Sequence, residues 1–163
     1  MTDVLVRPAS MSDLSAICAI EDDSFPSPYP RFLLQRLLQY HPETFLVAAN
    51  EADLLVGYCV CSINDRTAHL ISIAVQRNHR KRGVATALLD RLLAHLVERG
   101  VDEIWLEVSV NNREAIALYS KSGFARLNTI PTYYSNGSDA LRMHLIITNA
   151  AAGLPRETDG NRS

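Results

Sequence analysis

The sequence predicts one α/β domain, because helical and strand patterns alternate along 163 residues without an internal repeat. The clearest observation is a central unit, in which the apolar run HLISIAV precedes a helical stripe of leucines and then the run EIWLEVSV. A strand, a helix and a second strand in this order predict a parallel pair with a right-handed connection. A composition of 47% hydrophobic and 21% charged residues is typical of a globular chain with a real core.

The segment before the central unit predicts three strands and two helices. VLVRP is a short strand, and apolar residues at helical spacing follow a cap at Ser10 or Ser12. The stretch FPSPYPR ends that helix, because three prolines within five residues exclude a continuous helix. FLLQRLLQY predicts a short amphipathic helix, and the runs TFLVAAN and LLVGYCVCSI predict strands joined as a hairpin near Glu51 and Asp53.

The segment after the central unit predicts one more helix and two strands. The central helix should end at Gly100, and the helix within NREAIALYSKSG should end at Gly123. The strands FARLNTI and ALRMHLII flank the loop PTYYSNGSD. From Asn149 onward the residues are small, polar and turn-forming, so residues 1–148 are expected to form the domain and residues 149–163 a polar tail.

Several function classes are excluded by composition. A formal net charge of −2 argues against a nucleic-acid-binding protein, and no apolar stretch is long enough to span a membrane. The N-terminal stretch MTDVLVRPAS lacks the profile of a secretion signal. Cys18, Cys59 and Cys61 form no disulfide or metal-binding pattern, so we expect a cytoplasmic protein without a metal. The oligomeric state stays open.

The turn between the central strand and helix indicates an anion site. A helix start exposes unpaired backbone N–H groups, and its dipole adds roughly half a positive charge. Arg80, Lys81 and Arg82 add further positive charge, and Gly83 allows another molecule to approach the backbone closely. The stretch is neither a Walker A motif nor a dinucleotide fingerprint. A solvated basic turn is the alternative to a site for a phosphate-bearing ligand.

The same stretch resembles a known family. Residues 80–85, RKRGVA, fit the [QR]-x-x-G-x-[GA] motif of the GNAT acyltransferases. IWLEVSVNNREAIALYSKSGF is similar to the second half of RimI-type and archaeal N-terminal acetyltransferases, and TYYSNGSDALRM to their final loop and strand. The resemblance covers about residues 3 to 147 and implies the GNAT fold. In that fold a mixed central sheet, flanked by helices, has two splayed parallel strands with acetyl-CoA between them.

The resemblance implies a set of residues for acetyl-CoA. Main-chain groups of the central strand would bind the pantetheine arm, the basic turn and helix start would bind the pyrophosphate, and two side chains would contact the arm and the thioester. These residues are Ile73, Ala74 and Val75; Arg80, Lys81, Arg82, Gly83, Val84, Ala85 and Thr86; and Asn112 and Tyr119. Core packing remains an alternative for Ile73, Val75 and Tyr119, and a helix cap for Asn112.

Transfer of an acetyl group to an amine requires a base and a proton donor. Glu107 lies inside an otherwise apolar run and is the candidate base, since a carboxylate there needs a partner. The resemblance implies that Tyr119 is the general acid and that His69 contributes through a water molecule. A solvated glutamate and a structural histidine are the alternatives, and one His with one Glu are too few ligands for zinc.

The resemblance also implies where the acceptor binds. Phe25, Pro26 and Tyr29 would form one wall of a peptide groove that leads to Glu107, and Tyr133 and Tyr134 the facing loop. Core packing of Phe25 and a turn role for the tyrosine pair are the alternatives. Relatives that favour small N-terminal residues carry a glutamate where this chain has Ser27. The pattern F-P-x-x-Y is instead similar to enzymes that prefer an initiator methionine followed by an apolar residue.

Together these observations favour an N-terminal α-amino acetyltransferase that moves an acetyl group from acetyl-CoA directly to protein or peptide N-termini. Met-apolar starts should be preferred, with some use of Ser or Ala, and association with ribosomes is an option that the sequence leaves open. A lysine or small-amine acetyltransferase of the same fold is one alternative. A non-catalytic acyl-CoA-binding protein is the other, and the presence of both Glu107 and Tyr119 argues against it.

Overall fold

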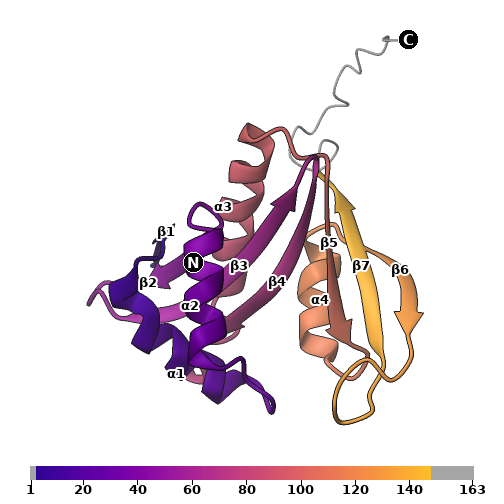
Figure 1. Ribbon diagram of the computed structural model, residues 1–163, viewed down its shortest axis with the longest axis horizontal. Helices are drawn as coiled ribbons and strands as arrows, with labels where there is room; N and C mark the ends of the chain where they lie inside the picture. Colours follow the sequence, from indigo (N-terminus) through magenta and orange to yellow (C-terminus); the bar gives the residue numbers. More distant parts are fainter. Residues whose placement is uncertain (1–2, 148–163) are drawn as a thin grey trace. The chain divides into compact units, whose positions relative to one another are not determined.

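The computed structural model describes residues 3–147 (Figure 1). These residues divide into two compact units. The first unit runs to Ser62 and includes Leu70–Leu92; the second comprises Ile63–His69 and the residues from Leu93 onward. Seven strands of the described residues pair in the order β1-β2-β3-β4-β5-β7-β6. This mixed sheet with its helices confirms the α/β fold class. The tail predicted over residues 149–163 lies outside the described residues.

The strands of the first unit form an antiparallel meander. β1 (Leu5–Pro8) pairs with β2 (Phe45–Ala49), and β2 pairs with β3 (Leu55–Asn64). Asp53 and Asp65 have φ angles of 63° and 61° in the turns before and after β3. Aspartate tolerates this left-handed conformation better than most residues, which suits it to such turns. The predicted hairpin near Glu51 and Asp53 is therefore confirmed.

Helices cover both faces of the first unit's sheet (Figure 1). Tyr58 of β3 hydrogen-bonds Glu21 of α1 (Leu14–Ser24), which packs with α2 (Arg31–Tyr40). A Cβ atom on the neighbouring Gly57 would lie 3.1 Å from Val84 of α3 (Val84–Glu98). Because adjacent strand residues point to opposite faces, α1 and α3 cover opposite sides. The core on the α1 side is formed by Leu14, Ile17, Ile20, Leu34, Leu38, Phe45, Val47, Tyr58, Val60 and Ala74.

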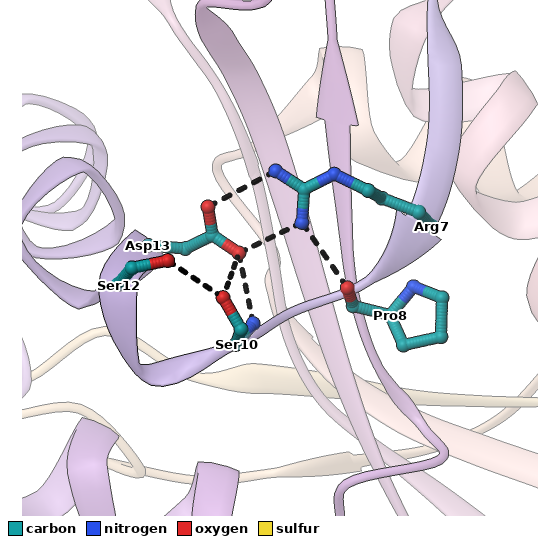
Figure 2. A network of polar contacts seen from close by, with 5 residues as sticks. All are labelled: Arg7, Pro8, Ser10, Ser12 and Asp13. Atoms are coloured by element: carbon teal, nitrogen blue, oxygen red, sulfur yellow. Dashed lines mark hydrogen bonds and ion pairs between the residues drawn. The ribbon is translucent and has the colours of Figure 1, made fainter.

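A polar network fastens β1 to the start of the first helical segment (Figure 2). Arg7 donates from both terminal nitrogens to the two carboxylate oxygens of Asp13, at 2.8 and 3.0 Å. Asp13 ends the 3-10 helix η1 (Met11–Asp13), and its carboxylate also accepts the backbone N–H of Ser10 at 2.8 Å. Ser10 and Asp13 form a capping box at the start of η1. The N-cap of α1, the helix for which a cap was predicted at Ser10 or Ser12, is Asp13.

The second unit contains β5 (Glu103–Ser109), α4 (Arg113–Lys121), β6 (Ala125–Ile130) and β7 (Ala140–Ile146). The start of β4 (Thr67–Val75) pairs with β5 in parallel, from Thr67 opposite Glu103 to His69 opposite Trp105. The parallel strand pair predicted for the central unit is therefore confirmed. β7 lies antiparallel between β5 and β6.

The two faces of β5 and β7 differ sharply. One face is buried and apolar: Ile104, Leu106, Val108, Leu141, Met143 and Leu145. Residues of the opposite face are only partly buried and most are polar or aromatic: Glu103, Trp105, Glu107, Arg142 and His144. Since one face supplies the core, the other is available for chemistry.

Candidate active site

Glu107 is the centre of a polar cluster in the second unit. Its side chain is only 8% exposed, and each of its two carboxylate oxygens has its own partner. Oε1 lies 2.9 Å from Nε2 of His69, while Oε2 accepts from Nε and Nη2 of Arg142 at 3.2 and 3.1 Å. The strand register explains this cluster, because Arg142 lies directly opposite Glu107 and His69 lies opposite Trp105.

The cluster determines the charge of Glu107. Burial by itself would raise the pKa of the carboxyl group. The hydrogen bond and charge of His69, followed by those of Arg142, outweigh burial and hold the pKa below its ordinary value. Glu107 is therefore ionised at neutral pH and a weak base.

The partners of Glu107 fix the roles of the histidine nitrogens. A carboxylate can only accept hydrogen bonds, so Nε2 of His69 carries the proton in their 2.9 Å contact. In a neutral ring Nδ1 is then a proton acceptor. The arrangement can remove a proton through Nδ1 while Glu107 stabilises the imidazolium that forms, as in a carboxylate–histidine pair of a hydrolase.

Trp105 supports both partners of Glu107. The His69 ring stacks on the indole with centroids 4.0 Å apart and planes 15° apart. The guanidinium carbon of Arg142 lies 4.9 Å from the indole centroid, which is cation–π distance. Arg142 and Trp105 were missed in the sequence analysis. A lone arginine within the apolar run ALRMHLII was the available signal, but its partner depends on strand pairing.

Tyr133 and Tyr134 lie in the loop between β6 and β7. Their rings meet edge to face, with centroids 4.9 Å apart, and both backbone N–H groups donate to the carbonyl of Ser138. Burial, then the negative charge of Glu107, raise the pKa of Tyr133, and Arg142 acts in the opposite direction. Tyr133 therefore lies within electrostatic reach of Glu107, although its side chain is half exposed.

Tyr119 and Asn112 both belong to α4. Tyr119 is buried and packs on Phe124 with ring centroids 5.6 Å apart. Asn112 caps the helix, since its side-chain oxygen accepts the N–H of Ala115 at 3.1 Å. Core packing and helix capping are thus present at these two positions. A role toward acetyl-CoA remains a prediction for both.

In the first unit, the predicted pyrophosphate turn has an unusual backbone. Lys81 and Gly83 adopt φ angles of 62° and 83°, directly before α3 begins at Val84. Glycine adopts this conformation without strain. The Arg80 side chain is engaged by protein, because its Nε donates to the carbonyl of Val75 at 2.9 Å and its Nη2 to Ser24 at 3.3 Å. Its charge is therefore held in place beside the turn.

The other predicted residues of the first unit lie in β4, α3 and the α1–α2 loop. Ala74 and Val75 are buried, and Ile73 is partly buried. Phe25 and Tyr29 pack against the core on the α1 side, as the core alternative for Phe25 predicted, while Pro26 is exposed. Along α3, Val84 is buried, Ala85 partly buried and Thr86 exposed; Arg82 is exposed before it.

A metal-binding cluster and a membrane-spanning helix are both absent from residues 3–147. No three His, Cys, Asp or Glu side chains of this range gather in a way that could hold a metal ion. No helix in the same range has the length and apolar character needed to cross a bilayer.

Comparison with known proteins agrees with this geometry. The acetyltransferase (GNAT) family matches residues 14–124. An N-alpha-acetyltransferase of Saccharolobus solfataricus is 32% identical over 154 residues, covering 86% of this chain and 92% of its own length. The crystal structure of Ard1 from Thermoplasma volcanium is 32% identical with a TM-score of 0.85, over 89% of this chain and 98% of Ard1. A NatC complex solved with a Gag peptide and CoA shares the fold, with a TM-score of 0.83 and 24% identity over 90% of this chain and 99% of its own.

Proposed function

Since the chain belongs to the GNAT acetyltransferase family and is an acetyl-CoA-dependent acyltransferase, we propose that it acetylates the α-amino group of protein or peptide N-termini. The observation that carries this proposal is the pair of Glu107 and His69, a proton-accepting group built on β5 and β4. The S. solfataricus relative, which is named for N-terminal acetylation, supports the choice of acceptor.

The reaction requires three events. The acceptor amine loses a proton, because an ammonium has no lone pair, and its nitrogen then forms a bond to the thioester carbonyl carbon. The carbon–sulfur bond breaks, and the CoA thiolate takes up a proton. We assign Nδ1 of His69 as the group that accepts the proton of the amine, with Glu107 stabilising the resulting charge. The Tyr119 hydroxyl is the group that donates a proton to the thiolate. Relative to the sequence analysis, this moves the base from Glu107 to His69.

The predicted acetyl-CoA residues remain part of the proposal. The positive φ angles of Lys81 and Gly83, together with the start of a 15-residue helix, support a pyrophosphate site at that turn. Arg82 and the amides of Val84, Ala85 and Thr86 would complete it. Ile73, Ala74 and Val75 would bind the pantetheine arm through main-chain groups, and Asn112 would contact the same arm.

The acceptor side is proposed to consist of the loop with Phe25, Pro26 and Tyr29 and the loop with Tyr133 and Tyr134. The first loop has no carboxylate at position 27, where Ser27 stands. Phe25 and Pro26 would leave an apolar slot for the first acceptor residue, and such a slot would suit a methionine side chain, whose full burial contributes roughly 1.5–3 kcal/mol. Peptides that begin with Met and an apolar residue are therefore the proposed best substrates, with slower use of Ser or Ala starts.

A peptide panel tests the proposal. Free peptides beginning Met-Leu, Ser and Ala should be acetylated at the N-terminus, as mass spectrometry of fragments will show. An N-terminally blocked peptide with an internal lysine, and a polyamine, should react far more slowly. His69→Gln and Glu107→Gln should each lower kcat by about 10²- to 10⁴-fold. Preferential transfer to lysine or to the polyamine would contradict the proposed acceptor.

A further inference from the structure

Glu21 is a buried carboxylate that the proposed reaction does not use. Glu21 lies near the end of α1 and is 2% exposed. Within residues 3–147 it forms no ion pair with a Lys, Arg or His side chain. Its carboxylate instead accepts two hydrogen bonds. The Tyr58 hydroxyl donates to Oε1, and the backbone N–H of Tyr29 donates to Oε2 at 2.8 Å.

The hydrogen bonds of Tyr58 have a defined direction. Tyr58 is fully buried on β3, and burial, then the charge of Glu21, raise the pKa of its hydroxyl far above the ordinary value. The hydroxyl therefore stays protonated and donates a hydrogen bond to Glu21. Ser72 of β4 lies 3.0 Å from the same hydroxyl oxygen and can donate to it. The chain of bonds thus runs from Ser72 through Tyr58 to Glu21.

The loop that Glu21 reaches offers few backbone donors. Between the end of α1 at Ser24 and the start of α2 at Arg31 the sequence is FPSPYP, so only Phe25, Ser27 and Tyr29 have a backbone N–H. Glu21 accepts hydrogen bonds from two of these three N–H groups. Its carbonyl binds the N–H of Phe25 at 3.2 Å, and its carboxylate binds that of Tyr29.

We infer that Glu21 is the positioning residue of the acceptor-binding loop: its carboxylate, held by Tyr58 and Ser72, sets the position of Phe25 to Tyr29 and so the shape of the slot for the first acceptor residue. This inference rests on the proposed function, which assigns that loop to the acceptor. Glu21 acts through the loop and does not touch the reacting atoms.

The chemistry predicts how the loop responds to substitution. Glu21→Gln keeps the size of the side chain but offers one acceptor oxygen and one amide nitrogen to two donors, so one hydrogen bond is lost. Tyr58→Phe leaves the carboxylate in place and removes only the donor that orients it. Asp22→Asn is the matched control, because Asp22 is exposed on the same helix and makes the same change of charge.

The experiment combines kinetics with amide hydrogen exchange. In Glu21→Gln the KM for a Met-Leu peptide should rise about tenfold or more, since a hydrogen bond to a charged group is lost, while kcat and the Kd for acetyl-CoA stay within about twofold. Exchange of the Tyr29 amide, followed by NMR, should quicken in the same variant. Tyr58→Phe should give a smaller change of the same kind, and Asp22→Asn none.

The outcomes separate this inference from the proposed function. If the unmodified protein acetylates no peptide, the proposed function fails. Hydrogen exchange of the Tyr29 amide still tests whether Glu21 holds the loop. Unchanged Tyr29 exchange in both Glu21→Gln and Tyr58→Phe would overturn the inference. So would an equal loss of kcat and of acetyl-CoA affinity, because that pattern indicates general destabilisation. Should Glu21→Gln fail to fold, Tyr58→Phe decides by the same two readouts.

Discussion

Glu107 shows at the scale of a single residue how strand pairing converts a buried carboxylate into part of a site. Glu107 was predicted because a carboxylate interrupts an apolar strand, and His69 because the resemblance to archaeal N-terminal acetyltransferases implies a histidine at that position. Arg142 could not be predicted in the same way. Its contact with Glu107 exists because β7 returns antiparallel beside β5, and strand order between distant segments leaves no local pattern.

Arg142→Leu should raise the pKa of Glu107, because one of the two partners that stabilise its charge is removed. NMR titration of the Glu107 carboxyl carbon measures this directly. Arg126→Leu is the control, since Arg126 is exposed on β6. A Glu107 titration midpoint that is equal in both variants would show that Arg142 contributes nothing to its charge.

The same variant has a predicted pH dependence of stability. A carboxyl group whose folded pKa is lowered stabilises the fold above its unfolded pKa, about 4.3 for glutamate, and this contribution disappears as pH falls through the folded pKa. Arg142→Leu should therefore lose stability relative to the unmodified protein at pH 7. The difference between the two should shrink below about pH 4.

At the scale of helices and strands, most elements followed from periodicity and breakers. The helix predicted from the leucine stripe to Gly100 spans Val84–Glu98, and the strand EIWLEVSV spans Glu103–Ser109. The short 3-10 helices η1 and η2 (Arg77–His79) were not predicted, because three-residue helices carry no periodic signal. The order of β7 and β6 was also not predicted, since both strands have similar composition.

Asp13→Asn should destabilise the junction of β1 and η1 shown in Figure 2. The hydrogen bond from Arg7 holds the pKa of Asp13 below its ordinary value despite burial. Loss of hydrogen bonds to a charged group typically costs about 1.5–3 kcal/mol. Urea unfolding at pH 7 should show this loss, and it should fade as the pH falls below about 4. Asp90→Asn, an exposed aspartate on α3, should change little.

The turn before α3 predicts that substitution of Gly83 affects both stability and acetyl-CoA binding. Gly83 has a φ of 83°, and Gly100 has a φ of 74° with open space around it. Alanine at either position should cost about 1–2 kcal/mol of stability, because both need the left-handed conformation. Only Gly83→Ala should weaken acetyl-CoA binding in calorimetric titration, by about tenfold. Equal affinity in the two variants would place the pyrophosphate elsewhere.

The α1–α2 loop predicts a change of substrate preference. Ser27→Glu adds a carboxylate where relatives with small-residue preference carry one, so the variant should use Ser- and Ala-initiated peptides better and Met-Leu peptides worse. A change of about 1.4 kcal/mol in relative transition-state stabilisation would alter the kcat/KM ratio tenfold. Ser27→Gln, of the same size without charge, should keep the original preference. A ratio that is identical in both variants would contradict a role for charge at this position.

For the whole molecule, the sequence predicted one domain over residues 1–148, and the described chain divides into two compact units. The divisions fall after Ser62, His69 and Leu92, inside β3, β4 and α3. No stretch of linker-like composition marks these three points, so composition along the chain does not reveal them. Because three regular elements continue from one unit into the other, we propose that the predicted domain unfolds as one cooperative system.

Trp105 makes this proposal measurable, because it is the only tryptophan of the chain and belongs to the second unit. Trp105 fluorescence and far-UV circular dichroism should give the same urea midpoint, as two-state unfolding requires. Leu88→Ala, in the first unit, removes a fully buried side chain and should cost about 2–5 kcal/mol. In a cooperative system the urea midpoint followed by Trp105 fluorescence must fall as far as the midpoint followed by circular dichroism, although the substitution lies in the other unit. Leu127→Ala, at a half-exposed position of β6, should leave both midpoints in place. A Trp105 transition that stays unchanged in Leu88→Ala would mean that the two units unfold independently, because the free energy lost in one would then not reach the other.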